Sequence, residues 1–133
     1  MNRLIVHLVP ILVALGLVIS AAAADQAKVT PLLSKELSDI DHKEAVMLTV
    51  EYAAGQSSPA HRHNAHTFVY VLQGAVMMGV NGKEPVRVDA GQTFYESPSD
   101  IHTVSRNASD SAPAKFLVFI VKDKGAPANA PAE

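Results

Sequence analysis

The stretch "GQSSPAHRHNAHTFVYVLQG" (residues 55–74) places a turn-rich loop and three histidines directly before an apolar run. The run "TFVYVLQG" (67–74) is rich in β-branched and aromatic residues and ends at a glycine, which is typical of a strand. His61 and His63 are two residues apart, and side chains two apart on an extended segment point to the same face. Two adjacent imidazoles on one face indicate half of a metal site; a chance pair on the surface is the alternative interpretation.

Strand signals continue on both sides of this stretch. The Asn81-Gly82 pair between two β-rich runs predicts a hairpin, because both residues accept a positive φ. Short strands separated by turn residues favour an antiparallel barrel or a double-sheet roll. We therefore predict an all-β domain of about seven or eight strands. The strand-like runs are 45–52, 67–74, 75–80, 86–88, one strand within 88–98, 101–107 and 115–121.

The first 24 residues differ from the rest of the chain. A short positive start is followed by an apolar run that is interrupted only by His7 and Pro10, and then by four alanines. This three-part pattern predicts a signal peptide that is cleaved between Ala24 and Asp25. An uncleaved membrane anchor is the alternative, because about 18 or more apolar residues are enough to span a bilayer.

The remaining chain divides into three parts. Residues 25–44 are polar and mixed, and we expect an N-terminal arm that is irregular or holds a short helix. Residues 45–123 hold the strand signals and form the predicted domain. Residues 124–133 are rich in alanine and proline, which predicts a disordered tail. A cleaved signal peptide would place this chain in the periplasm or outside the cell, with no membrane association after cleavage.

Composition excludes some classes of function. The chain has 133 residues, a formal net charge of −2 and no cysteine. A small, weakly acidic domain does not suit nucleic acid, which requires a basic face. Without cysteine the protein has neither disulfides nor thiolate chemistry. Stability must therefore come from an apolar core, a dimer interface or a bound metal.

A second stretch, "GQTFYESPSDIHTVSRN" (91–107), completes a pattern with the first. Together the two stretches resemble the paired motifs of the cupins, G-x5-H-x-H-x3–4-E-x6-G and G-x5-P-x-G-x2-H-x3-N. The resemblance is to small single-domain cupins of the second type, which are quercetin-dioxygenase-like. It implies an antiparallel double-sheet barrel, or jelly roll, after the signal segment. The matching positions are Gly55, His61, His63, Gly74, Gly91 and His102.

The sequence also departs from the cupin pattern. Thr67 stands at the position of the glutamate in the first motif. Ser97 and Ser99 replace the usual proline and glycine of the second motif, and Asn107 lies one residue later than the pattern asks. These departures affect the metal site and the loop before its last histidine.

The resemblance implies that His61, His63 and His102 bind one divalent metal, which would be Fe, Mn, Zn or Ni. The missing glutamate leaves either a three-histidine site or a four-ligand site in which His66 substitutes. Strand alternation places Thr67, but not His66, on the face shared by His61 and His63. A bulge would instead turn His66 toward the face shared by His61 and His63. Without a bulge, His66 lies at the rim of the barrel.

Two carboxylates of the second motif are candidates for a supporting role. Glu96 and Asp100 are the acidic residues nearest to His102 within this motif. Each is interpreted as an outer-shell partner of a ligating histidine, as a catalytic base, or as a solvated loop residue.

Three protein ligands leave open coordination positions for a substrate, as in catalytic metal sites. The predicted function is therefore that of an exported metal-binding cupin with dioxygenase-like oxidoreductase chemistry on a small organic molecule. The alternative is a non-catalytic cupin module that binds a small ligand or the metal alone. A homodimer is a further expectation, because the apolar run "KFLVFIV" (115–121) offers a strand for pairing between copies.

Overall fold

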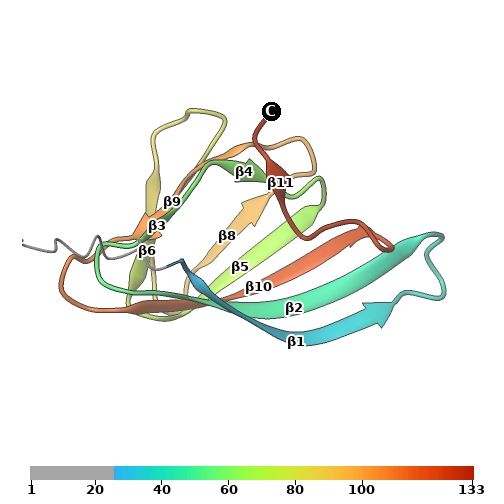
Figure 1. Ribbon diagram of the computed structural model, residues 1–133, viewed down its shortest axis with the longest axis horizontal. Coiled ribbons are helices and arrows are strands. Elements are labelled where there is room, and N and C mark those ends of the chain that lie inside the picture. Colours follow the sequence, from blue (N-terminus) through green and yellow to red (C-terminus); the bar gives the residue numbers. More distant parts are fainter. Residues whose placement is uncertain (1–25) are drawn as a thin grey trace, which may run out of the picture.

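The computed structural model describes residues 26–133, which form two antiparallel β-sheets and no helix (Figure 1). The first sheet has the strand order β1-β2-β10-β5-β8, and the second has the order β11-β4-β9-β6-β7, with β3 also paired to β9. The prediction of an all-β double-sheet fold is confirmed. The strands are β1 (Lys28–Glu36), β2 (Lys43–Tyr52), β3 (Ser57–Ser58), β4 (His61–Arg62), β5 (His66–Gln73), β6 (Ala75–Val80), β7 (Val86–Asp89), β8 (Thr93–Glu96), β9 (His102–Asn107), β10 (Ala114–Asp123) and β11 (Ala130–Pro131).

The apolar core lies between the two sheets, and β10 shows how the sequence builds it. Inward and outward residues alternate along this strand, so that Phe116, Val118 and Ile120 are buried while Leu117 and Phe119 lie on the outer face. β10 pairs on one side with β2 and on the other with β5, so it occupies the middle of the first sheet. The buried cluster is formed by Leu48, Tyr52, Ala65, Val69, Val71, Val76, Met78, Val88, Ala114, Phe116, Val118 and Ile120.

Two reversals in the chain depend on residues with positive φ. Asn81 and Gly82 have φ values of 55° and 69° between β6 and β7, as the hairpin signal predicts. Gly74 has a φ of 69° between β5 and β6. A Cβ atom on Gly74 would lie 2.7 Å from the carbonyl oxygen of Pro113, so only glycine fits this turn.

The N-terminal arm is a strand, which differs from the predicted irregular or helical segment. β1 pairs with β2 along its length, from Lys28 opposite Glu51 to Glu36 opposite Glu44. This pairing satisfies backbone groups of β2 that would otherwise face solvent at a free edge. The register shifts between Pro31 and Leu33, which suits a proline because it cannot donate to a regular ladder.

The C-terminal tail also differs from its prediction, because residues 126–131 run back across one end of the barrel (Figure 1). We call these residues the C-terminal strap. Its start is held by Lys122, which pairs with Glu44 and donates to the carbonyl oxygen of Ala126 at 2.6 Å. Its end is held by pairing of β11 with β4. Composition predicted disorder because the strap has no large apolar side chain, but backbone hydrogen bonds and a buried lysine fix it.

The predicted signal segment, residues 1–24, lies outside the described residues. Between residues 26 and 133, the fold includes no helix with the length and apolar character that crossing a bilayer requires.

Candidate metal centre

Three imidazoles meet where β4 and β9 pair. His61 on β4 lies opposite His102, the first residue of β9, and His63 directly follows β4. The ring centroid of His61 lies 4.9 Å from that of His63 and 5.0 Å from that of His102. One ligand nitrogen from each ring lies within 4.8 Å of the others. The three histidines singled out by the sequence are therefore placed together and could hold one metal ion.

Backbone carbonyls fix the orientation of two of these rings. Nδ1 of His61 donates to the carbonyl oxygen of Pro59 at 2.8 Å, and Nδ1 of His63 donates to that of Ala128 at 2.7 Å. A carbonyl oxygen only accepts, so in a neutral ring the proton sits on Nδ1 and Nε2 keeps its lone pair. Hydrogen bonds of this kind are typical of histidines that bind metals.

The third ring, His102, is buried without a hydrogen-bond partner. Its side chain is 3% exposed, and within the described chain neither ring nitrogen makes a hydrogen bond. A buried polar atom without a partner is costly, so these nitrogens suit a ligand that the chain itself does not supply. Burial, together with the neighbouring His61 and His63, lowers the pKa of His102 to about 3. The ring is therefore neutral, which is the form that binds metal.

Glu96 lies inside the site rather than in a solvated loop. It is the last residue of β8 and is 2% exposed. Its Oε2 atom lies 3.2 Å from Nδ1 of His102 and 3.7 Å from Nε2 of His63. Burial, together with the charge of Asp100, raises the pKa of the Glu96 carboxyl to about 8.

Asp100 has a structural role outside the cluster of imidazoles. Its carboxylate accepts hydrogen bonds from the backbone N–H of Ser97 at 2.8 Å and from Nδ2 of Asn81 at 2.7 Å. These bonds close the turn between β8 and β9, in the loop where the cupin pattern has proline and glycine. Asp100 is thus a positioning residue for the start of β9, and among the described contacts it has none to a histidine of the site.

Positions 66 and 67 face opposite sides of the first sheet, as strand alternation predicts. Thr67 is fully buried, and its Oγ1 atom has no hydrogen-bond partner in the described chain. His66 is exposed on the outer face, where its Nδ1 atom bonds to the hydroxyl of Tyr95 at 2.8 Å. His66 is therefore not brought to the metal centre, and its suggested substitution for the missing glutamate does not fit this geometry.

The centre opens into a cavity of about 840 Å³ inside the barrel. Most of its wall is apolar, including Leu48, Val69 and Phe116. A hydroxyl cluster forms one polar part of the wall, in which the Tyr52 oxygen lies 2.6 Å from Oγ of Ser58 and 2.8 Å from Oγ of Ser105. Strap residues 128–131 line the same cavity. The sequence did not reveal this cluster or the strap, because Tyr52 and the strap lie outside the paired motifs, and Ser58 and Ser105 occupy positions that the motifs leave open.

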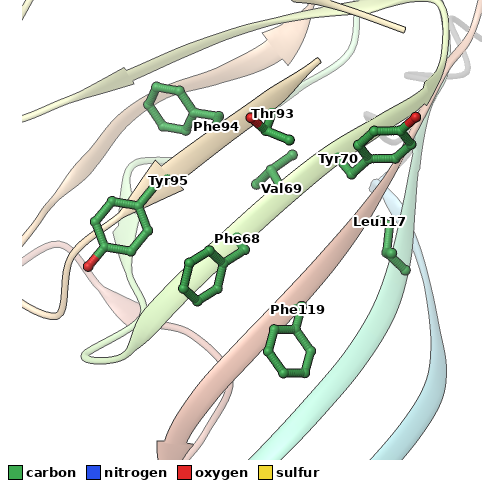
Figure 2. Close-up of a pocket in the computed structure, with 8 residues that line it drawn as sticks. All are labelled: Phe68, Val69, Tyr70, Thr93, Phe94, Tyr95, Leu117 and Phe119. Atoms are coloured by element: carbon green, nitrogen blue, oxygen red, sulfur yellow. The ribbon is translucent and has the colours of Figure 1, made fainter. Parts of the chain in front are cut away.

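A second hollow lies on the outer face of the first sheet and is not lined by the three histidines of the centre. Figure 2 shows the aromatic and aliphatic side chains around it, which come from β5, β8 and β10. The Phe68 ring contacts the rings of Tyr95 and Phe119 at centroid distances of 5.2 Å and 6.1 Å. Phe68 and Tyr95 are nearly half exposed, so this face is an apolar surface patch rather than a core.

Comparison with known proteins identifies the family. A family profile described as the cupin domain matches residues 48–120, so the chain belongs to the cupins. No curated protein sequence matches the chain at a significant level.

Solved structures share the fold at low sequence identity. A double-stranded β-helix protein from Klebsiella pneumoniae is 19% identical with a TM-score of 0.65, over 84% of this chain and 88% of that one. An oxalate oxidase in complex with glycolate is 20% identical with a TM-score of 0.62, over 82% and 56% of the two chains. A DMSP lyase from Ruegeria pomeroyi is 22% identical with a TM-score of 0.58, over 65% of this chain. The matched region spans only 42% of the lyase, and these likenesses show the fold alone.

Proposed function

We propose that this protein is an exported cupin that holds one divalent metal and carries out dioxygenase-like chemistry on a small organic molecule. The observation that carries the proposal is the convergence of three imidazoles, one of them buried without a partner, in the wall of a cavity. Export rests on the signal-peptide pattern of residues 1–24. A non-catalytic module that binds a small ligand or the metal is the second candidate, favoured by the departures from the cupin motifs.

The donor set suits a first-row transition metal. Neutral imidazoles bind Fe, Mn, Zn and Ni, and affinity alone does not select among them. When bound, such a metal supplies open coordination positions, and as Fe(II) it supplies redox chemistry with O₂. His61 and His63 present Nε2 to it because their Nδ1 atoms are held by backbone carbonyls.

The cavity wall determines which molecules fit beside the centre. Its apolar side chains exclude water and accommodate a hydrocarbon portion. The Tyr52 hydroxyl, held by Ser58 and Ser105, offers one polar contact to a ligand. Burial raises the pKa of Tyr52, so its hydroxyl stays protonated at neutral pH. A small, partly apolar molecule with one or two polar groups matches this arrangement.

Two of the similar structures support a small organic substrate. One is a DMSP lyase and the other an oxalate oxidase that holds glycolate. Both names refer to molecules small enough for a cavity of about 840 Å³. We therefore propose small carboxylates as the first compounds to screen.

Metal analysis of the purified protein tests the metal site. We expect about one metal per chain, lost when His61, His63 and His102 are all changed to alanine, because three ligands disappear together. His66→Ala is the matched control, since this histidine faces the outer surface and should leave the metal content unchanged. A protein that takes up no metal after addition of Fe(II), Mn(II), Ni(II) or Zn(II) would refute the proposal.

Two further measurements test enzyme activity and export separately. Oxygen consumption with product formation supports an enzyme, whereas saturable ligand binding without any product supports the non-catalytic module. The intact mass of the exported protein should equal that of residues 25–133, which begin at Asp25. A mass that retains residues 1–24 would instead support the membrane anchor.

A further inference from the structure

The wall that faces the metal centre lacks the carboxylate that the cupin pattern places on β5. Thr67 occupies that position, and its side chain is fully buried with an unpartnered hydroxyl. A threonine hydroxyl is a poor ligand for a divalent transition metal compared with a carboxylate. Three histidines alone would leave this side of the centre without a negative charge.

The neighbouring strand places a carboxylate at the same point of the wall. Thr67 on β5 is the direct partner of Glu96 on β8 in the antiparallel register. Directly paired residues project from the same face of a sheet, with Cβ atoms about 4.5–5.5 Å apart. The short Thr67 side chain therefore leaves room for the longer Glu96 side chain to reach the centre.

The position of the Glu96 carboxylate fits direct ligation. Its Oε2 atom lies 3.2 Å from Nδ1 of His102 and 3.7 Å from Nε2 of His63. Metal–nitrogen and metal–oxygen bonds of about 2.0–2.2 Å keep the ligand atoms of one ion roughly 3.0–3.5 Å apart. The separations from His63 and His102 are close to this range, but the group whose ligand atoms all lie within 4.8 Å of one another is formed by the three histidines without Glu96, so the carboxylate must shift to complete the site.

A supporting role through a hydrogen bond to His102 fits less well. Although Oε2 lies 3.2 Å from Nδ1 of His102, that nitrogen has no hydrogen-bond partner, so the oxygen is off the direction of the N–H. Among the described residues, the Glu96 carboxylate has ion-pair distances only to His63 and His102, and no hydrogen bond to any group. A carboxylate buried in this way is costly unless a cation neutralises it.

We propose that Glu96 is the fourth protein ligand, supplied by β8 in place of the glutamate that the cupin motif supplies from β5. This inference rests on the metal site proposed above. It adds a negative charge and a fourth protein ligand to that site. Moving the carboxylate between two paired strands keeps its place at the centre while changing its place in the sequence.

Exchanging the two side chains tests the proposal. Glu96→Gln should weaken metal binding by about 10- to 100-fold or more, because it removes a charged ligand. The double variant Thr67→Glu/Glu96→Thr returns the carboxylate to β5 and should recover most of that loss. Affinities are measured by competition with a coloured chelator. The absorption spectrum of the Co(II)-loaded protein reports the ligands directly: Glu96→Gln should change the spectrum, whereas Glu84→Gln, the matched control at an exposed position between β6 and β7, should preserve it.

Each outcome has a defined meaning. An unchanged affinity and Co(II) spectrum in Glu96→Gln would overturn the proposal and leave the histidine site standing. A weaker affinity with an unchanged spectrum would also overturn it, because Glu96 would then act only through another ligand. If Glu96→Gln does not fold, the double variant decides: tight binding supports the proposal, and weak binding in a folded double variant refutes it. Absence of metal from the unaltered protein would instead refute the proposed function.

Discussion

Two backbone carbonyls decide which nitrogen of His61 and His63 carries the proton. The carbonyl of Pro59 lies just before β4, whereas that of Ala128 lies in the C-terminal strap. Both leave Nε2 directed to the centre, so metal binding requires no change of tautomer at these rings. The centre is thus arranged by main-chain atoms as much as by the side chains that bind.

The turn at Gly74 gives a prediction for stability at the level of one residue. Gly74→Ala should lower the free energy of unfolding by about 2 kcal/mol or more, because a left-handed conformation costs roughly 1–2 kcal/mol and the new Cβ also meets the Pro113 carbonyl. Gly82→Ala is the control, since Gly82 has the same φ but no atom within 4 Å of the added Cβ. Urea unfolding measures both variants. Equal losses would show that the close approach to Pro113 contributes nothing.

Tyr52 gives a prediction for alkaline pH. Burial raises its pKa above 10, and the hydrogen bonds to Ser105 and Ser58 only partly offset that effect. Above that pH the unfolded chain releases a proton that the folded chain keeps, so stability must fall as pH rises. Chemical unfolding at about pH 9 and about pH 11 should show this loss in the unaltered protein and a smaller one in Tyr52→Phe. The same decrease in both proteins would contradict the assignment.

Among the elements, the central strands could be predicted from the sequence, but the two terminal segments could not. The runs 45–52, 67–74 and 115–121 correspond closely to β2, β5 and β10, because their alternation and apolar content reflect burial in one core. β1 is mostly exposed, so no apolar pattern marks it, and the strap is fixed by main-chain bonds that composition does not encode.

The candidate site was likewise predictable only in part. His61, His63 and His102 follow from motif spacing, and the opposite orientations of His66 and Thr67 follow from strand alternation. The place of Glu96 depends on which residue of β8 lies opposite Thr67. That register is set by the turns and packing between strands that are distant in sequence, so spacing along the chain does not reveal it.

The C-terminal strap gives a prediction at the level of an element. Deletion of residues 127–133 removes β11 and the carbonyl that holds His63. We expect the barrel to remain folded, metal affinity to fall by about 10-fold and metal release to become faster, because loss of an outer-shell partner typically costs that much. Chelator-induced metal release and circular dichroism measure the two effects. An unchanged release rate would show that the strap does not hold His63.

At the level of the whole molecule, the expected homodimer stays a prediction. The outer face of the first sheet is the candidate for its interface. Phe68, Tyr95 and Phe119 form a continuous ring cluster there, and patches of this kind often mark contact surfaces. Light scattering should give twice the mass of one chain, and Phe119→Lys should reduce it to that of a monomer. A dimer that survives this substitution would place the interface elsewhere.

The strap follows every proposed ligand in the chain, and this order has a consequence for how the protein matures. The three histidines and Glu96 are synthesised before residues 126–131, yet the His63 ring is held only when those residues are in place. A nascent chain that lacks the strap, or one cut before it, would therefore present an open centre that exchanges metal readily. Secure retention of the metal would mark a chain that has been synthesised and folded through β11.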